Sequence, residues 1–159
     1  MIRKAEKKDA FEIIKLIKEL AEYEVLLDEV NIEVNIDEEL FIKHLFDLKL
    51  ANALVAVEDG KIVAYALYFH SFSTFLGRAG VYLEDLYVKP EYRQKGIGLN
   101  LIKELAKICQ EQGFGRLEWE CLDWNEPSIK FYESIKAKRQ SGWIKFRMTK
   151  DEISTLVKG

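Results

Sequence analysis

The sequence predicts a mixed α/β fold in a single domain that spans residues 1–159. Apolar residues recur at helical spacing in some segments and form strand-like runs in others. The two kinds of segment alternate along the chain without repeats, low-complexity tracts or an interior linker. With 48% hydrophobic and 32% charged residues, the chain can bury a core beneath a solvated surface. Nine glycines and two prolines exclude a collagen-like or largely disordered chain.

The first elements are a short strand over residues 1–5 and a helix. Asp9 and Glu12 have the spacing of a capping box, which marks the start of that helix. Its apolar stripe consists of Ile13, Leu16, Ile17, Leu20 and Ala21.

A second helix is expected before the main sheet. Residues 23–34 lack a clean period and predict an irregular acidic connection. Asn35 and Glu38 repeat the capping pattern. The stripe that follows consists of Leu40, Phe41, His44, Leu45 and Leu48. Because His44 lies on this apolar stripe, we expect a core or interface histidine there, not a ligand.

Three strands come next. Residues 53–58 and 61–69 are joined by Asp59-Gly60, a pair that suits the positive φ angles of a two-residue hairpin. A further strand covers residues 81–88, and Pro90 prevents its continuation.

The remaining elements alternate again. A helix is predicted over residues 97–112, and Gly113 ends it. Residues 116–121 alternate like a strand, and a short helix over residues 127–134 begins with a proline, which the first helical turn tolerates. Residues 142–148 predict a last strand, followed by a polar amphipathic tail.

Charge and cysteine content restrict the partners and the location. Twenty-four Lys and Arg against 27 Asp and Glu give a net charge of -3, whereas nucleic-acid binders usually have a basic excess. No apolar run approaches the roughly 20 residues that span a bilayer. The charged start MIRKAEKKDA lacks the apolar stretch of a signal peptide. Two cysteines are too few for a disulfide framework. We therefore expect a cytoplasmic protein that binds neither nucleic acid nor membrane.

The most informative segment, which we call the glycine turn, lies between a strand and a helix and consists of residues 92–98 (YRQKGIG). Gly96 and Gly98 allow close backbone approach, and free N–H groups at a helix start suit a phosphate or pyrophosphate. Arg93 and Lys95 add positive charge nearby. The segment is neither a Walker loop nor a complete dinucleotide fingerprint. The residues alone leave two possibilities open, an anion-binding turn and a plain glycine-containing loop.

Several motifs, in order and at compatible spacing, carry a resemblance that covers nearly the whole chain. They are residues 16–24 (LIKELAEYE), 82–85 (YLED), 90–93 (PEYR), 93–98 (RQKGIG) and 123–132 (DWNEPSIKFY). The run Arg93-x-x-Gly96-x-Gly98 resembles the acetyl-CoA motif of the GNAT N-acetyltransferase superfamily. The whole set resembles its spermidine/spermine (diamine) acetyltransferase branch, which includes thialysine-acetylating relatives. The resemblance implies a GNAT fold, with a mostly antiparallel twisted sheet of about 6–7 strands, flanked by about four helices and splayed at an acetyl-CoA cleft.

The resemblance also implies acetyl-CoA as the co-substrate. The pantetheine arm would lie beside residues 86–88 like an extra strand, because its amides need peptide-like partners. The amides of residues 94–99 would hold the pyrophosphate. Asn125 and Ser128 would contact CoA from the opposite side. The residues expected at the cofactor are Leu86, Tyr87, Val88, Arg93, Gln94, Lys95, Gly96, Ile97, Gly98, Leu99, Asn125, Ser128 and Tyr132.

Transfer of an acetyl group to an amine of pKa about 10 requires a proton acceptor, and the leaving thiolate benefits from a donor. Glu84 and Asp85 are adjacent on a strand, so we expect their side chains on opposite faces. Both could be solvated, but a charge within the apolar run VYLEDLYV favours a functional pocket, because its burial is costly. In agreement with the resemblance, we assign Glu84 as proton acceptor through water and Asp85 as a cation-recognising group. The resemblance implies Tyr132 as general acid, although Tyr132 alone could simply pack the core.

The resemblance further implies a pocket for the amine. Acidic and aromatic side chains suit an ammonium through Coulomb and cation–π attraction, although each could singly be a surface residue. The residues expected to bind substrate are Tyr23, Glu24, Glu84, Asp85, Glu118, Trp119 and Glu120. His70 and the two distant cysteines lack metal-site spacing, so we expect no metal.

Three departures from the family pattern leave the amine open. Lys136-Ala137 stands where relatives have Gly-Ala, and because a lysine resists the left-handed conformation, we expect a different local turn. Ser141 replaces an acidic residue before Gly-Trp, and Phe75 replaces a tryptophan.

Together these observations predict an acetyl-CoA-dependent N-acetyltransferase in which a primary amine attacks directly in a ternary complex. The expected amine is a diamine, a polyamine or a thialysine-like molecule. A protein or peptide amine, such as a ribosomal N-terminus, and a non-catalytic acyl-CoA-binding module are the alternatives. We also expect a homodimer, with residues 143–146 as a shared or swapped edge.

Overall fold

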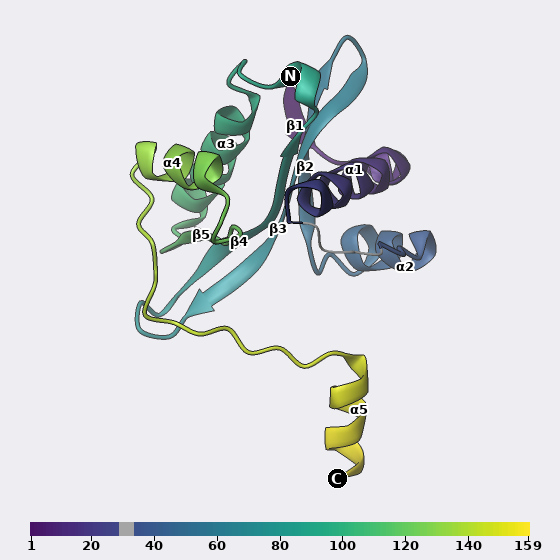
Figure 1. Ribbon diagram of the computed structural model, residues 1–159, viewed down its shortest axis with the longest axis vertical. Coiled ribbons are helices and arrows are strands. Elements are labelled where there is room, and N and C mark those ends of the chain that lie inside the picture. Colours follow the sequence, from purple (N-terminus) through teal and green to yellow (C-terminus); the bar gives the residue numbers. More distant parts are fainter. Residues whose placement is uncertain (29–33) are drawn as a thin grey trace. The chain divides into compact units, whose positions relative to one another are not determined.

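The computed structural model describes residues 1–28 and 34–159 (Figure 1). The chain forms two compact units, a first unit over Met1–Glu120 and a second unit over Cys121–Gly159. Whether they make one domain stays a prediction. In the described part of the chain, no helix combines the length and apolar character needed to cross a membrane.

The first unit is built on a sheet with strand order β1-β2-β3-β4-β5. The strands are β1 Ile2–Lys4, β2 Asn52–Glu58, β3 Lys61–Ser73, β4 Arg78–Val88 and β5 Leu117–Trp119. All neighbours pair antiparallel except β4 and β5, which pair parallel. The mixed α/β fold with a mostly antiparallel sheet is confirmed, although five described strands are fewer than the expected number.

Helices cover both faces of this sheet. The helices of the first unit are α1 Ala10–Asp28, α2 Glu38–Ile42 and α3 Ile97–Gln112, together with the short turns η1 Lys7–Asp9, η2 Lys43–Asp47 and η3 Pro90–Tyr92. As Figure 1 shows, α1 and α2 lie on one face and α3 on the other. Two apolar clusters fill the layers, one containing Ile13, Leu16 and Tyr65 and the other Leu101 and Leu105. Burial of these side chains holds the sheet between its helices.

The hairpin between β2 and β3 confirms the turn prediction. Asp59 and Gly60 have φ angles of 47° and 75°, and Glu58 pairs with Lys61. Positive φ at both central residues is the geometry that Asp-Gly supports in a two-residue hairpin.

The predicted helix caps are wrong by a few residues. Glu6, not Asp9, is the N-cap of η1, which runs directly into α1. Asp9 accepts the Glu6 N–H at 2.7 Å, and Arg3 donates to its carboxylate as well, so its oxygens are already occupied. At α2 the cap is Asp37, not Asn35, and its carboxylate accepts the Leu40 N–H at 3.0 Å.

Two further expectations fail near these helices. Residues 23–28 continue α1 instead of forming an irregular connection, because they lack Gly and Pro and are rich in Glu and Leu. The connection beyond them lies partly outside the described residues. His44 is exposed, so a core position for it is wrong, because η2 is a π-helical turn whose extra residue interrupts the 3.6-residue spacing. A place for His44 at an interface stays a prediction. Leu45 is the buried member of that stripe.

In the second unit, α4 covers Glu126–Ser134 and α5 covers Lys150–Lys158. Lys136 has a φ of 71°, its N–H donates to Glu133 O at 3.0 Å, and the Ala137 N–H donates to Tyr132 O at 3.1 Å. This is a Schellman motif, so the expected change of turn at Lys136 is wrong. The two hydrogen bonds offset the cost of a left-handed lysine.

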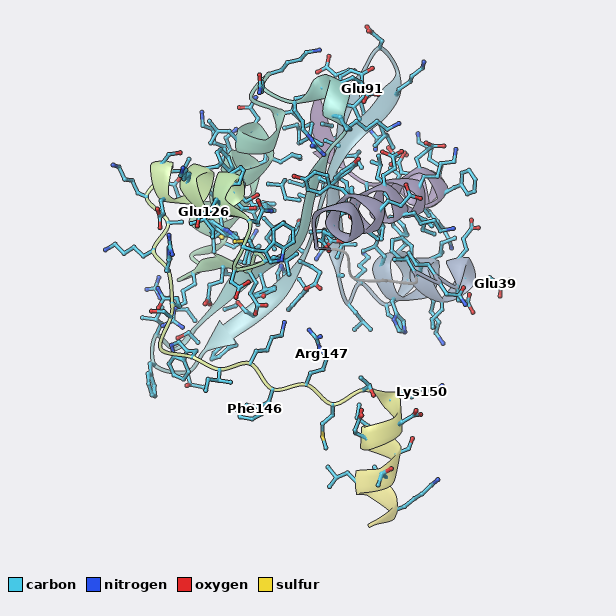
Figure 2. All side chains as sticks on the ribbon, viewed as in Figure 1. Glu39, Glu91, Glu126, Phe146, Arg147 and Lys150 are labelled. Carbon is cyan, nitrogen blue, oxygen red and sulfur yellow. The ribbon has the colours of Figure 1, made fainter. Side chains whose placement is uncertain are left out.

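The predicted strand over residues 142–148 is also wrong. These residues have no strand structure, and Trp143 and Phe146 are exposed by 82% and 90%. Figure 2 shows Phe146 and Arg147 projecting from the extended segment that leads to Lys150. A strand requires a partner to satisfy its backbone groups, and sequence periodicity does not show whether one exists. The amphipathic tail is helix α5, capped by Thr149 and Glu152.

Candidate active site

A β-bulge lies at the centre of the first unit's predicted site. In the β3–β4 register Leu67 pairs with Asp85 and Tyr68 with Leu83, so Glu84 is an extra residue on β4. Leu83 packs in the cluster beneath α3, whereas Tyr87 packs in the cluster beneath α1. The bulge thus switches the face on which odd-numbered residues lie. Because the bulge breaks the alternation of side chains at this point, that alternation does not show that Glu84 and Asp85 lie on opposite faces of the strand.

The two carboxylates differ in environment. Glu84 is exposed, whereas Asp85 is half-buried, so the cost of charge burial applies to Asp85 alone. The hydroxyl of the buried Tyr65 donates to Asp85 Oδ2 at 2.9 Å. Burial raises the pKa of Asp85, the negative charge of Glu84 raises it further, and the Tyr65 hydrogen bond opposes both. Burial also raises the pKa of Tyr65, so this hydroxyl keeps its proton and acts as a donor.

Helix α1 brings another carboxylate toward Asp85. Burial raises the pKa of the half-buried Glu24, and the charge of Asp85 adds to the effect. Across residues 1–28 and 34–159, no Lys or Arg forms an ion pair with either carboxylate. Two neighbouring carboxylates without an internal cation suit a cationic ligand.

Strand β5 adds two acidic residues to the same face of the sheet. Tyr82 pairs with Glu118, and Leu83 pairs with Trp119. Glu118 therefore lies on the face of Tyr82, while Trp119 packs against the cluster beneath α3. Burial raises the pKa of Tyr82, and a hydrogen bond with Glu120 raises it further. The structure thus separates Trp119 from the other residues expected to bind substrate.

We call the carboxylates that lie around β4, β5 and α1 the acidic face. It consists of Glu24, Glu84, Asp85, Glu118 and Glu120. Aromatic rings line it as well, because Phe69 stacks on Tyr82 with ring centroids 5.0 Å apart. The combination of negative charge and aromatic rings can attract an ammonium group.

In the part of the chain that the structure describes, the far end of β4 and the glycine turn have an unpaired strand edge and an open helix start. Strand β5 pairs with β4 only at residues 81–83, so in the described chain residues 86–88 have no strand partner on that side. Gly96 is the N-cap of α3 with a φ of 79°, and a Cβ there would meet no atom within 4 Å. The first helical hydrogen bond runs from Asn100 N to Gly96 O, so the amides of residues 97–99 precede the helical ladder. A helix start with open space before it suits a pyrophosphate.

The two cations of the glycine turn have different environments. Arg93 Nε donates to Val88 O at 2.8 Å, and its guanidinium lies over the rings of Tyr23 and Tyr87. Lys95 is exposed, with its Nζ 5.0 Å from the centroid of the Tyr92 ring. Lys95 is therefore the cation that is available to an anion at this turn.

The remaining predicted residues lie on α4 in the second unit. Asn125 is the helix N-cap, and its Oδ1 accepts the Ser128 N–H at 3.3 Å. Tyr132 is half-buried, and burial together with the charge of Cys121 raises its pKa to about 12. Its phenol therefore keeps its proton at neutral pH and is able to donate it.

Sequence reasoning missed Tyr65 and Glu19. Tyr65 fixes the Asp85 carboxylate, and Glu19 accepts a hydrogen bond from the Tyr87 hydroxyl at 3.1 Å. A hydroxyl within the apolar run KIVAYALYF was a signal for Tyr65, since a buried phenol needs a partner. No comparable signal exists for Glu19, which looks like any charged residue on an amphipathic helix.

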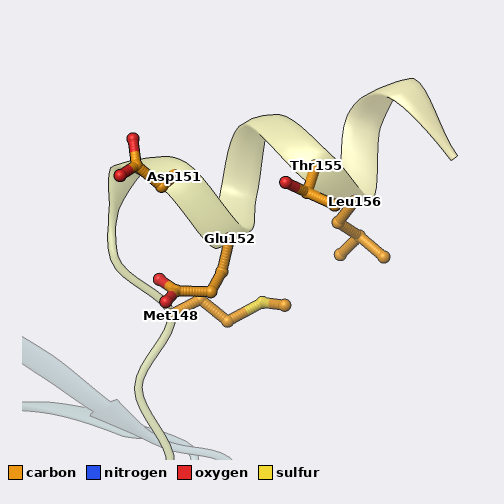
Figure 3. Close-up of a pocket in the computed structure, with 5 residues that line it drawn as sticks. All are labelled: Met148, Asp151, Glu152, Thr155 and Leu156. Carbon is orange, nitrogen blue, oxygen red and sulfur yellow. The ribbon is translucent and has the colours of Figure 1, made fainter.

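Two hollows lie away from the predicted residues. A groove of about 350 Å³ lies along α2 and is bordered by Leu67, the residue that pairs with Asp85. A second hollow of about 440 Å³ lies along α5 and is lined by Met148, Asp151, Glu152, Thr155 and Leu156 (Figure 3). None of the residues predicted for catalysis or binding lines either hollow.

Comparisons with known proteins identify the family. Residues 15–136 match the acetyltransferase (GNAT) family. A thialysine N-epsilon-acetyltransferase from Bos taurus is 39% identical over 158 residues, which cover 92% of this chain and 91% of the relative. The spermidine/spermine N(1)-acetyltransferase-like protein 1 of Homo sapiens is 33% identical over 162 residues, covering 96% of this chain and 23% of that protein. An integron cassette protein from the mobile metagenome of V. cholerae has a TM-score of 0.80 and 26% identity, covering 100% of this chain and 98% of that one.

The match to the family spans most of the chain, and the relatives that cover it are named N-acetyltransferases. The fold that the resemblance implied is the fold that the structure has. The chain belongs to the acetyltransferase (GNAT) family and is an N-acetyltransferase.

Proposed function

We propose that this enzyme uses acetyl-CoA to acetylate a small aliphatic amine that carries more than one positive charge, such as a diamine, a polyamine or a thialysine-like molecule. One observation carries the proposal. Asp85 and Glu24 are half-buried neighbours that no Lys or Arg of the described residues neutralises, and the negative charge of Glu84 acts on Asp85 as well. A ligand with several ammonium groups would supply the missing positive charge.

The glycine turn and β4 would hold acetyl-CoA, which supplies the acetyl thioester. The amides of residues 97–99 and the ammonium of Lys95 suit the pyrophosphate. The edge of residues 86–88, which has no strand partner on the β5 side of the described chain, suits the amides of the pantetheine arm. These residues are part of the set that the family resemblance assigned to the cofactor. Arg93, also in that set, is turned away from the open side of the turn.

Three side chains have separate roles in the proposed reaction. Glu84, exposed beside the bulge, accepts a proton from the ammonium through water. Asp85, held by Tyr65, fixes the position of the cation. As the amine nitrogen forms the amide bond, the carbon–sulfur bond breaks, and Tyr132 gives its phenolic proton to the leaving sulfur. The second proton that the nitrogen loses restores the Tyr132 phenol through solvent. Direct attack by the amine requires no acetylated enzyme residue.

A substrate panel tests the proposal. We expect kcat/KM for putrescine, spermidine or thialysine to exceed that for any member of a peptide panel, which includes ribosomal N-terminal sequences, by at least about 100-fold, because each missing charge contact costs 1.5–3 kcal/mol. A preference for peptides would favour the alternative substrate class. Tight CoA binding without acetylation of any amine would contradict the proposed reaction.

We also propose that the enzyme is a homodimer. The segment over residues 143–146 is extended and exposes Trp143, Ile144 and Phe146, which is costly in water and suits a second copy of the chain. Light scattering at micromolar concentration is expected to give twice the monomer mass. A monomer mass that persists with added CoA would contradict this assembly.

A further inference from the structure

Arg93 opens the glycine turn, yet its side chain is half-buried and points back toward α1. Its Nε donates to Val88 O, the last carbonyl of β4, at 2.8 Å. We propose that Arg93 is a positioning residue that couples the amine-binding helix α1 to the CoA-binding strand and turn. This inference rests on the proposed function, because α1 and the turn are assigned there to the two substrates.

The guanidinium of Arg93 lies between two aromatic rings. Its Cζ is 4.9 Å from the ring centroid of Tyr23 on α1 and 5.5 Å from that of Tyr87 on β4. Both distances are within the range of cation–π attraction. The same side chain therefore contacts the helix next to Glu24 and the strand next to the bulge.

Two more residues tie the same elements together. The Tyr87 hydroxyl donates to Glu19 Oε2 at 3.1 Å, and Lys89 Nζ lies 3.7 Å from Glu19 Oε1. Burial and the Glu19 hydrogen bond raise the pKa of Tyr87 to about 12, so its hydroxyl stays a donor. We call Glu19, Tyr23, Tyr87, Lys89 and Arg93 the Arg93 network.

The backbone at Arg93 explains why its anchorage matters for the turn. Arg93 is extended, with φ −71° and ψ 165°, whereas Gln94 and Gly96 have φ angles of 61° and 79°. The chain thus reverses immediately after the residue whose side chain is fixed on Val88. A guanidinium that moved to a phosphate would have to leave both rings and the Val88 carbonyl. Lys95, exposed on the same turn, would leave a single ring, that of Tyr92, to meet the phosphate.

The network predicts that CoA and the amine bind cooperatively. A ligand that orders the glycine turn also orders Arg93, and Arg93 in turn holds the part of α1 that carries Tyr23 and Glu24. Coupling between two sites typically amounts to a factor of about 5–150 in affinity. A lysine at position 93 keeps the positive charge, but it has a single nitrogen at the end of its side chain. It cannot lie over the two rings and at the same time donate a hydrogen bond to Val88 O as the arginine Nε does.

Steady-state kinetics with the best amine of the panel separates the two roles of Arg93. We expect Arg93→Lys to raise the KM for the amine, measured with saturating acetyl-CoA, about tenfold, and the KM for acetyl-CoA, measured with saturating amine, by a similar factor, because coupling between two sites is reciprocal. Lys95→Gln, on the same turn but outside the network, should raise the KM for acetyl-CoA and leave the KM for the amine unchanged. The double variant Arg93→Lys/Tyr23→Leu should be little worse than the poorer single variant, because both substitutions break one contact. A rise in the KM for acetyl-CoA alone, or fully additive effects, would overturn the proposal.

Amide hydrogen exchange provides a readout that does not depend on finding the amine. In the free protein, Arg93→Lys should speed exchange in residues 16–24 of α1, and CoA should slow that exchange in the parent enzyme more than in the variant. Melting temperatures identify any variant that fails to fold, in which case Tyr23→Leu replaces it in the same measurement. If no amine is acetylated, the proposed function fails, whereas exchange in α1 that is identical in the parent and both variants would refute the coupling.

Discussion

Asp9 and Asp85 are both shielded from solvent, but they have different partners. Asp9 is 5% exposed, and Arg3 donates two hydrogen bonds of 2.6 and 3.0 Å to its carboxylate. The hydrogen bond from Arg3 lowers the pKa of Asp9, against the opposing effect of burial. Asp85 is half-buried and accepts a hydrogen bond from the neutral hydroxyl of Tyr65, and burial raises its pKa. Among the residues that the structure describes, the fold thus supplies a positive partner for the carboxylate of Asp9 but none for the carboxylate of Asp85.

The difference separates a structural carboxylate from one that can bind a ligand. A buried charge with a well-placed internal partner contributes to the fold only while both partners remain. A partly buried charge without one is a cost to the fold, which an external cation can offset. Asp85 and Glu24 share a deficit of positive charge across β4 and α1, whereas the Arg3–Asp9 pair is confined to the start of the chain.

The largest expected effect on the fold is at Asp9. Asp9→Asn leaves Arg3 without its carboxylate, so we expect the free energy of unfolding at pH 7 to fall by about 3 kcal/mol. The folded pKa of Asp9 is lowered, so its stabilising contribution is complete above the unfolded pKa of about 3.9 and is lost as the pH falls through the folded pKa. Urea unfolding at neutral and acid pH measures both effects. Asp59→Asn, in a turn that accepts either residue, is the matched control and should change stability by less than about 0.5 kcal/mol.

The next largest effect is on turnover. If Glu84 accepts the proton of the amine, Glu84→Gln should lower kcat by roughly 100-fold or more, and higher pH should restore part of the rate by supplying free amine. Tyr132→Phe keeps the ring but removes the donor, so its defect should persist at high pH. CoA affinity should barely change in Glu84→Gln. Glu111→Gln, an exposed change near the end of α3, is the control, and full activity in both variants would refute the assigned acid and base.

Acid should weaken amine binding before it affects the cofactor. Burial raises the pKa of Asp85 and Glu24, so on acidification they take up protons earlier than exposed carboxylates with pKa values of about 4. Protonation removes the charge that holds an ammonium, so the KM for the amine should rise severalfold as the pH falls through this range. The KM for acetyl-CoA, measured on the same samples, should stay flat there. A KM for the amine that is constant down to pH 4 would show that these carboxylates do not hold the cation.

The sequence predicted the parts of the fold that depend on local chemistry. Asp59-Gly60 specified its hairpin, and the glycine turn was placed correctly between β4 and α3. The helix starts were shifted because Glu6, Asp9 and Glu12 stand three residues apart, so two capping boxes were possible. Only the Arg3 side chain, which occupies Asp9, decides between them.

Features that depend on three-dimensional partners could not be predicted. The bulge at Glu84 arises from the pairing of β4 with β3, and alternation along one strand gives no sign of it. The orientation of Arg93 depends on Tyr23, which is far away in sequence. Glu84 and Asp85 stood out as charges within an apolar strand, and the other acidic residues of the site were found by family resemblance. The structure adds that Glu118 lies on the face of Tyr82 and that Trp119 packs elsewhere.

The KM for the amine in Asp85→Asn tests the central claim, that the acidic face receives a cationic amine. We expect it to rise about tenfold, a loss of about 1.4 kcal/mol, while the KM for acetyl-CoA is unchanged. The free energy of unfolding should stay the same or increase, because Asn carries no charge to bury and can still accept the Tyr65 hydrogen bond. An unchanged KM for the amine together with a loss of stability like that of Asp9→Asn would contradict the claim and make Asp85 a second structural carboxylate.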